Sequence, residues 1–301
     1  MHAEPGNAIT IRFALPSAKL RPFVTTYYLT EAKTGAAEPQ LEDYLHPEWP
    51  NLRFMAPGWS RFAISDAPLA PSPGFAVTGP TSKATRFQIG TGRSWGIGLL
   101  PLGWATLFDA PAGDYADKGV DGRTDPAFAG LSALADALQT KRGFAEDVAL
   151  IEAHLSALIT TVPNHATAIS AINAALVDPE MASAAQLAEA VGMNLRSLER
   201  LSRRAFGFPP KLLLRRQRFL RSLSQFMLDP SLKWLSTLDY QYHDQAHFVR
   251  DFKRFMGMTP GAYAKLEKPM LIAAARARME IAGQAVQGLH DPAAATRSGA
   301  A

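Results

Sequence analysis

The chain has 301 residues, of which 47% are hydrophobic and 19% charged, a globular balance that excludes an intrinsically disordered protein. It contains no cysteine, which excludes a disulfide framework, a thiolate zinc site, an iron–sulfur cluster and a cysteine nucleophile, and which fits the cytoplasm. No segment approaches the ~18 apolar residues of a membrane span, and no basic and apolar leader follows Met1. We therefore expect a cytoplasmic protein of two domains that does not contact a membrane.

The charge is distributed unevenly along the chain. Residues 1–165 carry 13 basic and 16 acidic side chains, whereas residues 166–268 carry 15 basic and 9 acidic ones. Between Met193 and Arg221 there are nine cations and one anion, Glu199. This density predicts a surface for a polyanion, and a solvated helix face is the alternative interpretation.

The first hundred residues have the pattern of a β-rich domain. Short runs rich in aromatic and β-branched residues alternate with glycine and proline, which is typical of a small sandwich or barrel. The predicted strands cover residues 9–15, 23–30, 51–56, 61–65, 75–78, 86–89 and 95–100. The glycine-rich segment 90–96 lacks the helix and the lysine of a phosphate loop, so we expect a hairpin turn there.

After Trp104 the pattern becomes helical. Apolar residues spaced three and four apart predict helices over residues 125–140 and 144–160, and a breaker cluster at 162–165 ends this region. The sequence thus predicts an α+β protein with a boundary near residue 165. An alanine-rich tail begins at 269, with a helix expected over 271–285 and disorder from Gly288.

The region 166–268 contains an internal repeat with an offset of fifty residues. Asn194 and Asp244 are each placed to cap a new helix, and Gly207 and Gly257 are each placed to end it. A short helix is expected before each cap, over residues 184–191 and 232–239. The remaining matched pairs are Leu198 and Phe248, Arg200 and Arg250, Arg203 and Lys253, Arg204 and Arg254, and Pro210 and Pro260.

Each repeat has the plan of a helix-turn-helix unit. The helical period separates a packing stripe from an outward face, and an outward face with arginine and glutamine suits the major groove of DNA, because arginine can bind guanine and glutamine can bind adenine through two hydrogen bonds. The predicted DNA-facing residues are Arg196, Glu199, Arg200, Arg203, Gln245, Ala246, Val249, Arg250 and Lys253. Lys211 and Arg218, on or near the helix between the units, are expected to contact phosphate.

The second repeat, residues 242–260, resembles the signature of AraC/XylS-type transcription regulators, and the resemblance extends over about residues 168–266. It implies two helix-turn-helix units joined by a long helix, here residues 209–228. Three residues depart from the family pattern, which expects glycine at Gln241, a small residue at Thr237 and an aromatic residue at Ser202.

The opening segment, residues 14–28, is similar to the N-terminal domain of one group of these regulators. The resemblance implies a cupin-like barrel that senses an effector and mediates dimerisation over residues 1–165. The partners it implies are double-stranded DNA, a second copy in a homodimer, a small-molecule effector of unknown identity and, for an activator, RNA polymerase. Trp49, Phe54, Trp59 and Phe62 are candidates for an effector pocket, although aromatic residues at strand spacing are also typical of a core.

Two other functions remain open at this stage. One is a cupin-like enzyme carrying a DNA-binding module, and the other is an architectural DNA binder of low sequence specificity. The spacing of His243 and His247 imitates a zinc motif, but Asp244 is better placed as a helix cap, which puts His243 outside the helix. We expect no catalytic residue, no metal and no cofactor, and we expect His247 to bond to backbone or to DNA phosphate.

Overall fold

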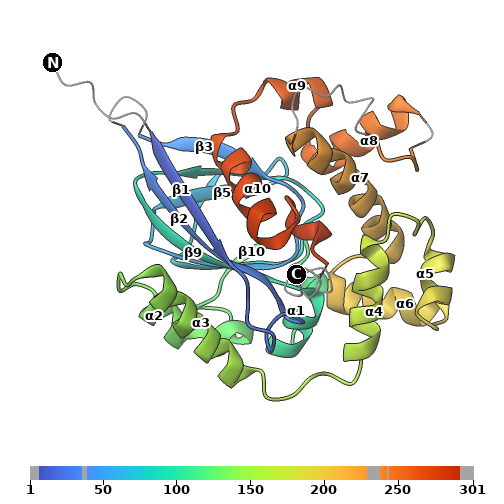
Figure 1. The fold of residues 1–301 in the computed structure, drawn as a ribbon, viewed down its shortest axis with the longest axis horizontal. Coiled ribbons are helices and arrows are strands. Elements are labelled where there is room, and N and C mark those ends of the chain that lie inside the picture. The colour runs from blue at the N-terminus through green and yellow to red at the C-terminus, as the bar shows by residue number, and fades with distance from the viewer. Residues whose placement is uncertain (1–6, 36–38, 229–237, 243, 292–301) are drawn as a thin grey trace.

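The N-terminal half of the computed structural model consists of two antiparallel sheets (Figure 1). The structure describes residues 7–35, 39–228, 238–242 and 244–291. One sheet has the strand order β1-β2-β9-β4-β7-β10 and the other the order β3-β8-β5-β6. The strands are β1 (Ala8–Ala14), β2 (Val24–Lys33), β3 (Leu41–Leu45), β4 (Asn51–Met55), β5 (Ser60–Ile64), β6 (Ala70–Pro71), β7 (Phe75–Thr78), β8 (Thr85–Ile89), β9 (Gly92–Leu99) and β10 (Gly119–Asp121).

The seven predicted strands are all present, because each is long enough to show its apolar pattern. Strands β2 and β9 are buried over most of their length, with Tyr27, Ile97 and Leu99 fully inaccessible. Three strands were not predicted. β3 contains two acidic residues in five, and β6 and β10 are too short for a pattern to be visible.

The predicted hairpin at the glycine-rich segment is wrong. Residues 90–91 connect β8 in one sheet to β9 in the other, so this turn is a corner between the sheets. The indole of Trp59 packs against this corner and donates a hydrogen bond of 2.9 Å to the carbonyl of Gly90. A side chain on Gly92 would place its Cβ 2.4 Å from the Trp59 ring, so the close approach requires glycine.

The helical segment after the sheets is more broken than predicted. The expected helix over 125–140 is a 3₁₀ helix, η2 (Pro126–Leu131), followed by the short α2 (Ser132–Ala137). The expected helix over 144–160 is confirmed as α3 (Phe144–Leu158). The buried carboxylate of Asp147 fastens α3 to the sheet, because it accepts hydrogen bonds of 2.8 Å from both Trp95 and Arg93.

The second half of the chain is helical throughout the described residues, apart from its turns. The long helix between the units is confirmed, whereas most of the predicted helix 232–239, including Thr237, lies outside the described residues. The elements of this second half are α4 (Ala166–Val177), α5 (Ala184–Ala190), α6 (Leu195–Phe206), α7 (Pro210–Leu228), α8 (Gln245–Met256), α9 (Pro260–Lys265), α10 (Pro269–Ala282) and η4 (Gln287–Leu289). Two further short helices, α1 (Pro101–Leu107) and η1 (Ala112–Tyr115), lie in the first half of the chain.

The β-rich region and the first helical unit share one hydrophobic core. This core runs from strand residues such as Leu52 and Ile97 to Leu198 and Phe206 of α6. The second unit has a separate core built from α7, α8, α9 and α10. Residue 165 lies between the helices α3 and α4, and the hydrophobic packing is continuous across it.

The two sheets together are called the barrel below. The C-terminal tail folds back onto this barrel (Figure 1). Helix α10 lies against β1 and β3, and the Asp43 carboxylate accepts the backbone N–H groups of Met270 and Leu271 at 3.0 and 2.9 Å. We expected disorder from Gly288, but Gly288 and Leu289 are buried. The reason is local packing, because the carbonyl of Gly288 accepts a 2.7 Å hydrogen bond from Gln217 of α7.

Candidate nucleic-acid interface and barrel cavity

Both repeats begin and end as their sequences predict. The Asn194 side chain accepts the backbone N–H of Ser197 at 2.9 Å, and the Asp244 carboxylate accepts that of His247 at 2.6 Å. Gly207 and Gly257 end the two helices with φ of +82° and +72°, a backbone conformation that favours glycine. The predicted caps are confirmed, and α6 and α8 are equivalent helices.

The two helices have the expected division of faces. In α6 the buried stripe includes Leu198 and Leu201, and in α8 it includes Phe248, Phe252 and Phe255. Among the predicted DNA-facing residues, only Val249 is half-buried. The exposed ones are Arg196, Glu199, Arg200, Arg203, Gln245, Ala246, Arg250 and Lys253.

The two predicted phosphate contacts differ in their surroundings. Lys211 is exposed, whereas the side chain of Arg218 is only 14% exposed and lies over the ring of Tyr242, 4.8 Å from its centroid. Its Nη2 is 3.6 Å from the carboxylate of Asp251, which partly neutralises its charge. Both residues line a cleft between the two units, together with Arg215 and Arg250.

A buried carboxylate that the sequence analysis did not identify holds α8 against α7. Asp251 is fully inaccessible, forms an ion pair with Arg215, and accepts a 3.2 Å hydrogen bond from the hydroxyl of Tyr242. His247 lies 4.0 Å from the same carboxylate and 3.4 Å from Arg218. A signal was present in the sequence, since Asp251 is an acidic residue within the apolar stripe of an amphipathic helix.

His247 therefore lies between the side chains of Arg218 and Asp251, and its predicted bond to backbone or to DNA phosphate stays a prediction. Burial, together with the nearby Arg218, lowers its pKa below the ordinary value. His243 lies outside the described residues. Among the residues that the structure describes, no three histidine or carboxylate side chains are grouped as metal ligands.

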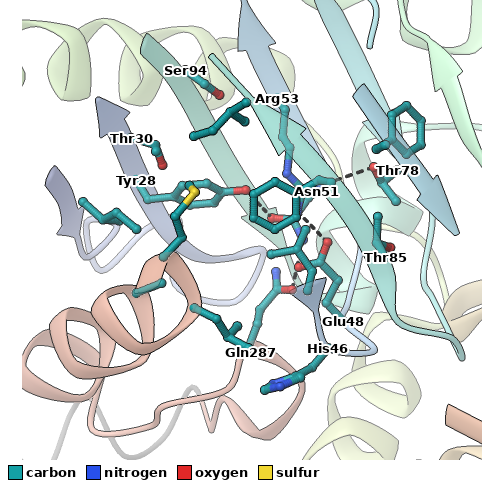
Figure 2. A pocket seen from close by; sticks show the side chains of 18 of the residues that line it. Tyr28, Thr30, His46, Glu48, Asn51, Arg53, Thr78, Thr85, Ser94 and Gln287 are labelled. Carbon is teal, nitrogen blue, oxygen red and sulfur yellow. Dashed lines mark hydrogen bonds and ion pairs between the residues drawn. The ribbon is translucent and has the colours of Figure 1, made fainter. Parts of the chain in front are cut away.

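The barrel encloses a cavity of about 190 Å³, closed on one side by α10 and the residues that follow it. Figure 2 shows a cluster of hydrogen-bonded polar side chains on the cavity wall. There Arg53 pairs with Glu48 at 2.5 Å, Tyr28 donates to Asn51 at 3.1 Å, and Asn51 donates to Gln287 at 3.0 Å. The remaining wall is largely apolar, which is typical of a small-molecule site.

The four aromatic residues predicted for an effector pocket divide into two pairs. Trp59 and Phe62 line the cavity. Trp49 instead lies under the guanidinium of Arg216, 3.8 Å from ring centroid to Cζ, and Phe54 stacks on Phe75 in the core. The Trp49 contact joins the barrel to α7, where Arg216 is completely buried and donates to the carbonyl of Thr81 at 3.0 Å.

His46, at the edge of the cavity, connects the barrel to the second unit. Its Nε2 lies 2.8 Å from the hydroxyl of Tyr263 in α9. Burial lowers the pKa of His46 to about 3, so the imidazole is neutral at pH 7.

No helix among the described residues has the length and apolar character needed to span a lipid bilayer.

Residues 187–266 match a family model described as a helix-turn-helix domain. No curated protein matches the chain. A crystal structure of ToxT from Vibrio cholerae covers 86% of this chain and 98% of its own at 10% identity, with a TM-score of 0.42. A crystal structure of ToxT from Vibrio cholerae O395 covers 86% of this chain and 97% of its own at 12% identity, with a TM-score of 0.40. A crystal structure of the AraC-like transcriptional activator CuxR covers 72% of this chain and 87% of its own at 13% identity, with a TM-score of 0.23.

The capped helices, their exposed basic faces and this match define a DNA-binding helix-turn-helix domain. The domain is of the AraC type, with α7 as the helix between its two units. Residues 187–266 therefore form a helix-turn-helix domain within this chain.

Proposed function

We propose that this protein is a sequence-specific transcription regulator that binds double-stranded DNA and is controlled by a small molecule held in the barrel. The observation that carries the proposal is the pair of N-capped helices fifty residues apart. Each has a buried apolar stripe and an exposed polar face, and the long helix α7 lies between them in the chain. Most outward residues of the two helices are exposed, so they are available to a ligand.

Arginine and glutamine on the outward faces match the chemistry of base edges. Arg200 in α6 and Arg250 in α8 occupy equivalent places, and each can bind the O6 and N7 atoms of guanine. Gln245 stands at the first position of α8, the end of a recognition helix that enters the major groove. A phosphate contact by Lys211 of α7 is supported by its exposure and by the cleft that it lines together with Arg250.

Selection of bound sites from a random DNA library tests this function with the full chain. We expect an enriched, non-palindromic site for each protomer, with two conserved segments about one helical turn, ~34 Å, apart. Arg200→Ala should relax base preference in one segment only. Arg276→Ala, on the exposed side of α10, serves as the control and should leave the enriched site unchanged. A pool without sequence enrichment would instead support an architectural DNA binder.

The effector role of the barrel is supported by its cavity and by the direct contacts between barrel and helices. A homodimer formed through residues 1–165 is supported by the exposed apolar side chains of Leu158 and Val162, at 39% and 54% exposure. Sedimentation equilibrium of the full chain tests it, and a monomer at micromolar concentration would contradict it. Activation through RNA polymerase is tested by transcription in vitro from a promoter that carries the selected site.

A further inference from the structure

Arg278, on the helix that follows the DNA-binding domain, is a buried cation without a matching anion. Its side chain lines the barrel cavity and the residue is 5% exposed. Nη1 donates a 2.7 Å hydrogen bond to Thr26, but Nε and Nη2 are buried and have no hydrogen-bond partner. Guanidinium N–H groups in such a position are costly to leave unpaired, so they indicate a site for an acceptor.

The charges around the cavity leave one positive charge in excess. Glu48 and Arg53 neutralise each other through their ion pair. No carboxylate of the described residues forms an ion pair with Arg278, whose Cζ lies 5.8 Å from the centroid of the Phe13 ring. Burial lowers the pKa of Arg278 to about 10, so the group remains charged at pH 7. One monoanion would balance this charge.

The size and lining of the cavity restrict the rest of the ligand. A cavity of about 150 Å³ holds benzene, so about 190 Å³ accommodates one ring or a short aliphatic chain with a small head group. The apolar part of the cavity wall includes Ile11, Phe62 and Leu271. We propose that the effector is a compact apolar monocarboxylate whose carboxylate binds Nε and Nη2 of Arg278.

This assignment makes the C-terminal segment part of the effector site. The segment also contacts the linker helix, because Gln217 donates to the carbonyl of Gly288 and Leu220 packs against the same glycine. An effector bound to Arg278 would therefore act on a segment that contacts both the barrel and α7. The inference rests on the proposed function only for this regulatory role, since binding of the acid does not depend on DNA.

Calorimetric titration of the full chain with matched acids and amides tests the proposal. We expect benzoate and hexanoate to bind at least tenfold more tightly than benzamide and hexanamide, and inorganic sulfate not to compete. Arg278→Met should remove the preference for the acids, Arg278→Lys should retain part of it, and Arg276→Met is the matched control on the same helix. If Arg278→Met does not fold, the acid and amide comparison on the unaltered chain still decides.

Equal affinity for acid and amide, or no binding of either acid at millimolar concentration, would overturn the carboxylate assignment. So would an Arg278→Met variant that binds benzoate as tightly as the unaltered chain. Site selection on DNA reports separately on the proposed function. A protein that selects DNA sites but does not bind the acids contradicts only the present inference, and the reverse result contradicts only the function.

Discussion

Replacing Asp251 with asparagine removes a buried carboxylate that faces Arg215 and Arg218. The change preserves shape and keeps one acceptor for the hydroxyl of Tyr242, but it leaves two guanidinium groups beside a neutral side chain. Breaking a buried ion pair by removing one partner costs about 3–5 kcal/mol. Since Arg215 is 32% exposed and can turn toward water, we expect the lower end, about 3 kcal/mol.

Urea unfolding followed by circular dichroism measures this cost. A matched control is Asp109→Asn, which breaks an exposed ion pair with Arg204 and should not measurably change the unfolding midpoint. Because Asp251 holds α8 on α7, the variant should also lose affinity for the segment of the DNA site read by α8, while the segment read by α6 remains selected. A cost below about 0.5 kcal/mol would refute the role given to this carboxylate.

Three further outcomes are expected. Arg250→Ala should cost about 1–3 kcal/mol of binding to the selected site and less on random DNA, as competition binding will show; equal losses would argue for a phosphate contact. Lys211→Ala should weaken binding to all sequences and reduce the slope of log affinity against log salt concentration by about one. An unchanged slope would show that Lys211 does not contact the DNA. Burial raises the pKa of Asp43 to about 6 from 3.8, so its contribution to stability is present below pH 4 and is lost as pH rises through 6. The stability of the unaltered chain relative to Asp43→Asn should fall by about 3 kcal/mol over that range, and a pH-independent difference would contradict the raised pKa.

The features predicted correctly are those that a local pattern determines. The caps at Asn194 and Asp244 and the glycines that end both helices depend on backbone chemistry within a few residues, so the repeat predicts them. The exposed faces follow from helical period alone. Strand β3 and the corner near Gly90 depend instead on which strands pair, and pairing between distant segments leaves no local pattern.

The sequence also could not show which aromatic residues meet the cavity. Trp49 and Trp59 belong to similar turn-rich segments, yet one is covered by Arg216 of a helix more than 150 residues away and the other faces the cavity. Arg278 was missed for the same reason. Arg278 is a candidate ligand-binding residue because it is buried without an anion. That burial arises only when the alanine-rich tail packs against the barrel, and the tail sequence alone does not show this contact.

The continuous packing across residue 165 restricts how this regulator can be rebuilt or recombined. A DNA-binding segment cut from the chain would expose the side of α6 that contacts the barrel, including Phe206, and would lose the cover that Trp49 gives to Arg216. Joining this segment to a different β-rich domain would therefore require an aromatic contact for Arg216 and a surface for residues 269–290. Exchange of β-rich domains between proteins built in this way should succeed only when these contact surfaces are transferred with them.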